Sequence, residues 1–150
     1  MKNTLTLCIA FFSLCYSSNL FSNNPRGWET CFDNDSVKIE FTYVDCEYVE
    51  VFDQELVILR IINKLDTEAV ISWKEELWYD DQCVNCNQDN VEYIKTTTLK
   101  AKEKLEGDCD TNNNLKIFSK FTDKIEDLPI LGVKKIAALS RFELKNISIK

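Results

Sequence analysis

The stretch from Glu55 to Glu75, ELVILRIINKLDTEAVISWKE, holds two runs rich in strand-forming residues on either side of a short polar segment. The first run, Glu55 to Ile62, is apolar on both faces of the expected strand apart from Glu55 at its start and Arg60, which is typical of a central strand buried on both faces. The second run, Ala69 to Lys74, alternates inward-facing and outward-facing residue types. Because Asn63 to Asp66 has the composition of a turn, the stretch predicts two strands joined as an antiparallel hairpin.

Strand patterns recur on both sides of this stretch, and polar loops separate them. We expect loops at Tyr79 to Asn90, Gly107 to Asn114 and Asp123 to Gly132. Roughly seven strands with turns between them predict an all-β chain, an antiparallel β-sandwich of immunoglobulin-like architecture. The further expected strands are Val37 to Tyr43, a β-rich run of mixed phase at Cys46 to Phe52, Val91 to Thr98, an edge strand or single turn at Lys100 to Glu106, Leu115 to Phe121, and Ala138 to Ile149 with a bulge near Lys145 and Asn146.

The N-terminus has the pattern of a secretory signal. Lys2 precedes an apolar run from Leu5 to Tyr16, and small polar residues follow it. We expect a signal peptide over residues 1–22, cleaved after Ser17 to Ser22, and one β-sandwich domain over residues 23–150. A spanning helix needs roughly 20 apolar residues, so the sequence predicts no membrane span. The expected location is secreted, periplasmic or in the cell envelope.

Composition excludes several kinds of chemistry. The chain has 150 residues, 45% of them apolar and 29% charged, which fits a globular domain with a core. It contains no histidine, so Ser-His-Asp and Cys-His catalysis and histidine-ligated metal hydrolases are impossible on it. The net charge of −7 disfavours nucleic acid as a partner. We expect no cofactor.

Five cysteines remain once the signal segment is set aside, and all are disulfide candidates in an oxidising compartment. An odd number leaves at least one thiol free or paired elsewhere. The pairs we favour are Cys86 with Cys109, which both fall in polar loops, and Cys31 with Cys46. The remaining candidate is Cys83.

Cys83 and Cys86 form a CVNC motif, which can be a redox dithiol or half of a zinc site. A redox dithiol is activated by a helix N-terminus, but Asn87 to Asn90 predicts no helix, and nearby acids such as Asp81 would raise a thiol pKa. A zinc site needs a second cysteine pair at matching spacing, which the sequence lacks. A structural disulfide is therefore the favoured interpretation.

Asp108, Asp110 and Asn112 occupy the first, third and fifth places of a calcium-loop pattern. The pattern breaks because Asn113 replaces the loop glycine and Ser119 replaces the bidentate glutamate. A calcium-binding helix-loop-helix is excluded, and a looser surface calcium site stays open beside the commoner interpretation, acidic residues that stabilise a turn.

Glu75 and Glu76 lie beside three aromatic residues, which makes them the one carboxylate pair to consider for glycoside hydrolysis. The same patch could instead bind sugar or peptide by stacking and hydrogen bonds, with Trp78, Tyr79 and Glu76 as candidates. The simplest interpretation is that Trp73 packs inside while its alternate neighbours face water.

Three functions remain open. The favoured one is an exported, non-catalytic β-sandwich that serves binding or structural interaction, with an unknown protein, peptide or glycan as partner. The first alternative is a thiol-disulfide or metal-binding protein centred on CVNC. The second alternative is a carboxylate-dependent hydrolase, and the sequence favours a protein that is not an enzyme.

Overall fold

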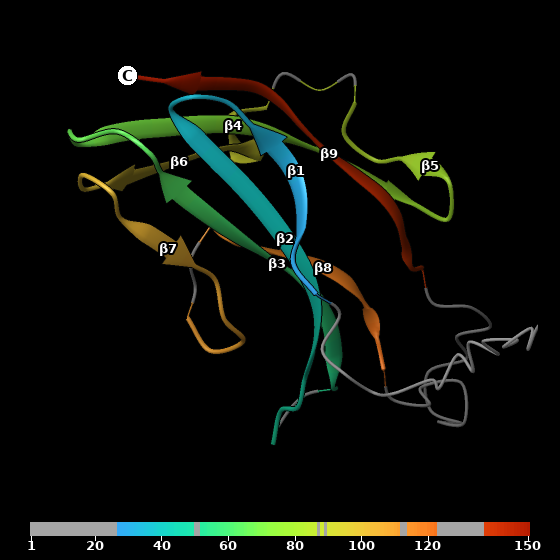
Figure 1. Cartoon of the computed structure of the whole chain (residues 1–150). Coiled ribbons are helices and arrows are strands. Elements are labelled where there is room, and N and C mark those ends of the chain that lie inside the picture. Colours follow the sequence, from blue (N-terminus) through green and yellow to red (C-terminus); the bar gives the residue numbers. More distant parts are fainter. Residues whose placement is uncertain (1–26, 50–51, 87, 89, 112–113, 123–136) are drawn as a thin grey trace, which may run out of the picture.

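The computed structural model describes residues 27–49, 52–86, 88, 90–111, 114–122 and 137–150, and they form an all-β fold of two antiparallel sheets (Figure 1). The first sheet consists of β1 (Glu29–Asp33), β2 (Val37–Cys46), β3 (Gln54–Asn63), β7 (Lys104–Glu106) and β8 (Lys116–Phe121). The second consists of β5 (Gln82–Cys83), β4 (Ala69–Tyr79), β6 (Ile94–Leu99) and β9 (Leu139–Ile149). The predicted signal segment lies outside the described residues.

The two strands predicted between Glu55 and Glu75 form, but the prediction that they pair as a hairpin is wrong. Strand β3 pairs with β2, β7 and β8, whereas β4 pairs with β5, β6 and β9 in the other sheet. The connection crosses between the sheets and is held by the buried Asn63, whose Nδ2 donates to the carbonyls of Thr67 and Lys100, both at 2.8 Å. Because both strands carry an apolar face, packing face to face buries more apolar surface than pairing edge to edge.

The inner faces of the two sheets share one core. Val57, Leu59 and Ile61 of β3 are fully buried, and Ile71 and Trp73 of β4 belong to the same buried cluster. In each strand these are every second residue, because alternate side chains of a strand point to the same face.

The outer face of the first sheet is covered as well, which explains why Glu55 to Ile62 is apolar at both parities. Leu56 and Ile58 are nearly fully buried beneath Trp28 and Cys109. Arg60, the one charge inside this run, donates from Nε to Glu40 Oε2 at 2.8 Å, and its guanidinium carbon lies 3.9 Å from the Trp28 ring centroid. The prediction of a central strand buried on both faces is confirmed.

Several strand boundaries differ from those expected. Strand β2 continues to Cys46, and the described part of the predicted run from Cys46 to Phe52 adds no further strand. A single 3-10 turn, η1 (Val91–Tyr93), stands where the strand from Val91 was expected to begin. The exposed strand β1 was not predicted at all, because ETCFD has no apolar alternation. The expected loop from Asp123 to Gly132 falls outside the described residues.

The predicted bulge in the last strand is confirmed. Ser72 pairs with Ser148 and Lys74 with Lys145, so β9 has one residue more than β4 between these pairs. Asn146 takes a φ of 52°, in the left-handed region that asparagine tolerates better than most residues. Within the described ranges, no helix is both long and apolar enough to cross a bilayer.

Candidate functional site

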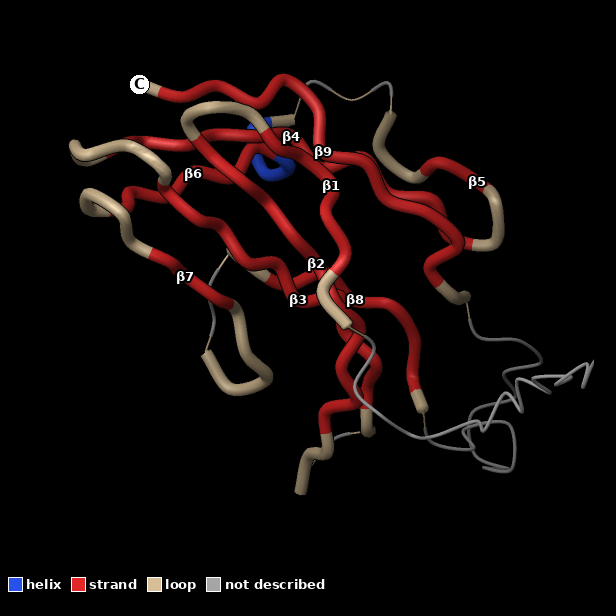
Figure 2. Tube along the Cα trace, in the orientation of Figure 1, coloured by secondary structure: helices blue, strands red, loops and turns tan. Residues whose placement is uncertain are grey.

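The binding and catalytic candidates of the sequence gather on the second half of β4, between β9 and β5 (Figure 2). Successive side chains of a strand point to opposite faces, so Trp73, Glu75 and Tyr79 face the core while Glu76 and Trp78 face outward. Glu75 and Glu76 therefore lie on opposite faces of the sheet. They do not supply the two facing carboxylates that glycoside hydrolysis requires.

Glu75 is a buried acid inside the core. Its side chain accepts a hydrogen bond from Trp73 Nε1 at 3.3 Å, and the residue is 5% exposed. Burial penalises the charged carboxylate and raises the pKa of Glu75 to about 7. Near neutral pH this carboxyl is thus partly protonated.

Tyr79 connects the two sheets. Its hydroxyl donates to the carbonyl of Phe118 in β8 at 2.7 Å, and its ring stacks on the Phe118 ring at a centroid distance of 6.3 Å. Burial, and secondarily the nearby Glu75, raise the pKa of the Tyr79 phenol. The structure therefore separates Tyr79, which faces inward, from the other two predicted binding residues, Glu76 and Trp78.

The outward-facing residues of β4 meet those of β9 and form a patch of alternating charges around one tryptophan. Arg141 pairs directly with Trp78, and its guanidinium carbon lies 3.9 Å from the ring centroid, a cation–π distance. We call this patch the β4–β9 outer face; it consists of Lys74, Glu76, Trp78, Arg141, Glu143 and Lys145.

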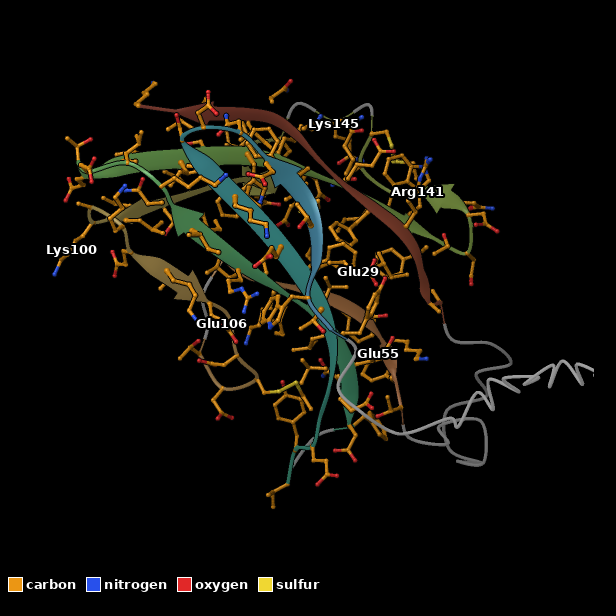
Figure 3. The ribbon with its side chains drawn as sticks, viewed as in Figure 1. Glu29, Glu55, Lys100, Glu106, Arg141 and Lys145 are labelled. Atoms are coloured by element: carbon orange, nitrogen blue, oxygen red, sulfur yellow. A yellow bond between two sulfur atoms is a disulfide. The ribbon has the colours of Figure 1, made fainter. Side chains whose placement is uncertain are left out.

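Ion pairs connect the members of the β4–β9 outer face. Glu143 contacts Lys145 and lies 3.5 Å from Arg141, and Lys74 lies 3.7 Å from Glu76. The hydrogen bond from Lys145 lowers the pKa of Glu143, and the same bond raises the pKa of Lys145. Figure 3 shows Arg141 and Lys145 on β9. Sequence reasoning missed the β9 residues, although the alternation in SRFELK could have indicated them.

The CVNC motif covers the short part of one β4 edge that lies between its pairings with β6 and with β5. A two-residue turn at Asp80 and Asp81, with φ values of 47° and 64°, returns the chain along β4 as the short strand β5. Asn85 is 1% exposed; its Oδ1 accepts from the Leu77 amide and its Nδ2 donates to the Glu75 carbonyl, both at 2.8 Å. The expected surface loop from Tyr79 to Asn90 thus contains a buried side chain that acts as a strand partner.

The disulfide pairs differ from those we favoured. The structure joins Cys83 to Cys86 and Cys46 to Cys109, and it leaves Cys31 free. Cys46 is buried on the outer face of the first sheet, and the loop that contains Cys109 folds over that face. Loop composition could not predict this contact because it depends on how the loop packs.

Cys31 is the extra residue of a bulge in β1, between the pairs Thr30–Glu40 and Phe32–Ile39. Its Sγ lies 3.4 Å from the Ile39 carbonyl and lines a cavity of about 280 Å³ beside Phe41 and Phe142. Although Cys31 as a whole is exposed, its thiol is turned into this cavity, and the desolvation of the thiol raises its pKa to about 11. The thiol is therefore a poor nucleophile at neutral pH.

Asp108, a candidate calcium ligand, accepts hydrogen bonds from its own loop. Its Oδ1 accepts from the backbone amides of Asp110 and Thr111 and from the Thr111 hydroxyl, at 2.9, 2.6 and 2.8 Å. These bonds, that from the Thr111 amide first, lower the pKa of Asp108. This is a side-chain turn, and Asn112 lies outside the described residues. In the described part of the chain, no group of three or more His, Cys, Asp or Glu side chains is arranged to hold a metal ion.

No protein-family model matches the chain, and comparisons with curated proteins and with solved structures find no similar chain. The candidate site is therefore defined by its own geometry.

Proposed function

We propose that this chain is an exported, disulfide-stabilised, non-catalytic β-sandwich that binds a protein or peptide through the β4–β9 outer face. The observation that carries the proposal is the stack of Arg141 on Trp78. Tryptophan and arginine are the residue types most enriched among interface residues that dominate binding energy. Here they lie together on a sheet face, with Arg141 exposed and Trp78 half-buried.

The sandwich architecture is supported by two antiparallel sheets whose inner faces share a core. The likeness to immunoglobulin domains that we propose is one of architecture, two packed antiparallel sheets, and does not extend to the order of the strands. In immunoglobulin domains the third strand of the chain lies in the second sheet, whereas here β1, β2 and β3 are neighbours in one sheet.

Export is supported by the N-terminal apolar run and by two disulfides, which persist in oxidising compartments. The test is to express the full chain in an exporting host and to sequence the N-terminus of the released protein. A new N-terminus directly after a residue from Ser17 to Ser22 supports export. Intact Met1 on protein that stays inside the cell contradicts it.

Charge indicates what kind of partner fits. Three cations, Lys74, Arg141 and Lys145, accompany two acids on the β4–β9 outer face, although the chain as a whole carries a net charge of −7. The patch is thus locally positive and complements an acidic protein or peptide.

Binding is tested on peptide and glycan arrays with the fluorescently labelled, disulfide-intact protein. We expect retention on acidic peptides, a loss of roughly tenfold or more for Trp78→Ala, and weakening with added salt. The matched control is Tyr93→Ala, an aromatic residue of η1 outside the patch. Retention on glycans alone, or on peptides without dependence on Trp78, contradicts the proposal.

One observation favours a second candidate function, thiol–disulfide exchange at CVNC. The Cys86 amide donates to Cys83 Sγ at 3.0 Å, a bond that would stabilise a Cys83 thiolate after reduction. In the exchange, a substrate dithiol would be oxidised to a disulfide while Cys83–Cys86 is reduced to two thiols, with two electrons and two protons transferred. The test is oxidation of a reduced dithiol peptide, with Cys83→Ser/Cys86→Ser as the inactive control.

A further inference from the structure

The second sheet has one edge strand that carries no bulge and is not very short. Exposed edge strands invite pairing with other chains, and proteins commonly block them with bulges or keep them very short. In the described chain, β1, β8 and β9 carry bulges, and β5 and β7 have two and three residues. Strand β6 has six residues, and its register with β4 is unbroken.

The orientation of the β6 backbone follows from the hydrogen bonds of β4. Val70 exchanges both of its backbone bonds with Lys150, so Val70 and Ser72 direct their backbone groups toward β9. The intervening Ile71 and Trp73 therefore direct theirs toward their partners in β6, Thr97 and Lys95.

By the same alternation, the backbone groups of Ile94, Thr96 and Thr98 point away from β4. Among the described residues, the Thr96 carbonyl accepts only a long bond, from Asn114 Nδ2 at 3.4 Å, and a carbonyl oxygen can accept a second. The amides of Thr96 and Thr98 have no acceptor within the described residues. The edge of β6 thus presents backbone amides and carbonyls at every second residue, the spacing at which another strand can pair with it.

The side chains at this edge leave room for another strand. Lys95, the one charged residue in β6, turns its ammonium back to the Glu92 carbonyl at 3.0 Å instead of projecting across the edge. Ile94 is 50% exposed and Val91 75% exposed, so apolar surface lies at the same place.

We propose that β6 is a self-association edge, at which two copies of this chain pair their β6 strands antiparallel about a two-fold axis through Thr96. In this register Thr96 exchanges two bonds with its symmetry mate, and each Thr98 amide donates to the carbonyl of Ile94 in the other copy. The two second sheets then form one continuous sheet across the dimer.

Charge complementarity selects a second copy as the occupant. Glu92 and Lys100 lie just beyond opposite ends of β6, and both are exposed. A two-fold axis through Thr96 places the end of β6 next to η1, which carries Glu92, beside the end of the other copy that carries Lys100, so opposite charges meet at both ends of the shared strands. Figure 3 shows Lys100 beside the turn that follows β6.

Sedimentation velocity tests this proposal on the exported, disulfide-intact protein in a Cys31→Ser background, which removes any dimer linked through the free thiol. We expect a monomer–dimer equilibrium between about 1 μM and about 1 mM. The amides of Thr96 and Thr98 should gain hydrogen-exchange protection only at the concentrations that produce dimer. A monomer throughout this range overturns the proposal.

Two sets of variants identify the edge. Thr96→Pro removes an amide that points away from β4, a position where an edge strand tolerates proline, and should weaken association by at least about a hundredfold while the circular dichroism spectrum is kept. Lys100→Glu should weaken it roughly tenfold, and the double variant Glu92→Lys/Lys100→Glu should restore it. Val84→Lys, at an exposed apolar residue elsewhere, is the control and should change nothing. A dimer that persists in Thr96→Pro, or one that the charge swap fails to restore, overturns the proposed pairing.

Discussion

The side chain of Asn85 takes the place of a strand partner beside Leu77. Its oxygen accepts a hydrogen bond from the Leu77 amide, and its nitrogen donates one to the Glu75 carbonyl on the same edge of β4, both at 2.8 Å. The disulfide between Cys83 and Cys86 brackets this residue and holds it against the edge of β4. The CVNC motif thus carries a structural function that is visible in its hydrogen bonds.

We predict that Asn85→Ala lowers the free energy of unfolding by about 3 kcal/mol, because two buried backbone groups lose their partners. Urea denaturation followed by tryptophan fluorescence measures this. Asn90→Ala is the matched control, since Asn90 is exposed and caps only the 3-10 turn, and it should cost less than about 1 kcal/mol. Equal losses for the two variants would show that Asn85 does not act as a strand partner.

Glu75 should make stability depend on pH. Its pKa is about 7 in the folded state against an ordinary glutamate value of 4.5, so the unfolded chain releases this proton at lower pH. The contribution of Glu75 to stability is therefore complete below about pH 4.5, falls between pH 4.5 and 7, and stays lost above.

We accordingly predict that Glu75→Gln is more stable than the parent at pH 8 by about 2 kcal/mol and gains nothing at pH 4. Urea unfolding at a series of pH values gives both numbers. Glu76→Gln, on the outer face, is the control and should keep the pH slope of the parent. A Glu75→Gln variant with the parental slope would contradict burial of this carboxyl.

The two disulfides should contribute unequally to stability. The Cys46–Cys109 bridge spans 63 residues and Cys83–Cys86 spans 3, so loop-closure entropy gives about 4 and about 2 kcal/mol. We predict that Cys46→Ser/Cys109→Ser loses about twice the stability that Cys83→Ser/Cys86→Ser loses. Urea denaturation measures the loss, and non-reducing peptide mapping verifies the pairs. The reverse ranking would show that native-state packing outweighs loop length.

Cys31 should react slowly with alkylating reagents. With a pKa of about 11 instead of 9.0, its thiolate population at pH 8 is about a hundredfold smaller than that of an ordinary thiol. We predict that the iodoacetamide rate rises about tenfold per pH unit between pH 8 and 10, and that urea accelerates the reaction at pH 8. A rate that levels off near pH 9 in the folded protein would contradict desolvation of this thiol.

Strand periodicity predicted much of the fold. The parity of Val57, Leu59 and Ile61 on the inner face follows directly from ELVILRII, and so does the burial of Leu56 and Ile58 on the other face. The pairing of strands could not be read in the same way. Periodicity reports which faces are buried, but it does not report whether β3 and β4 meet edge to edge or face to face.

The candidate site was predictable in part. The parity of Glu75 with Trp73 already indicates that this acid faces the core and that Glu76 does not, so the two could have been separated from the sequence. Arg141 lies 63 residues beyond Trp78, and a cross-strand contact over that distance depends on the register of β9, which two bulges determine. The pairing of Cys46 with Cys109 is likewise set by tertiary packing.

Each sheet has its own cystine. Cys46–Cys109 joins β2 to the loop between β7 and β8 of the first sheet, and Cys83–Cys86 lies at the edge of the second. If the chain were stretched by its ends, the force would pass through the Cys46–Cys109 disulfide, and the 63-residue span that it closes could not extend. The maximum length of the unfolded chain is therefore shorter by roughly 210 Å. A domain built this way resists elongation under tension, yet its two layers can slide apart without any covalent bond breaking.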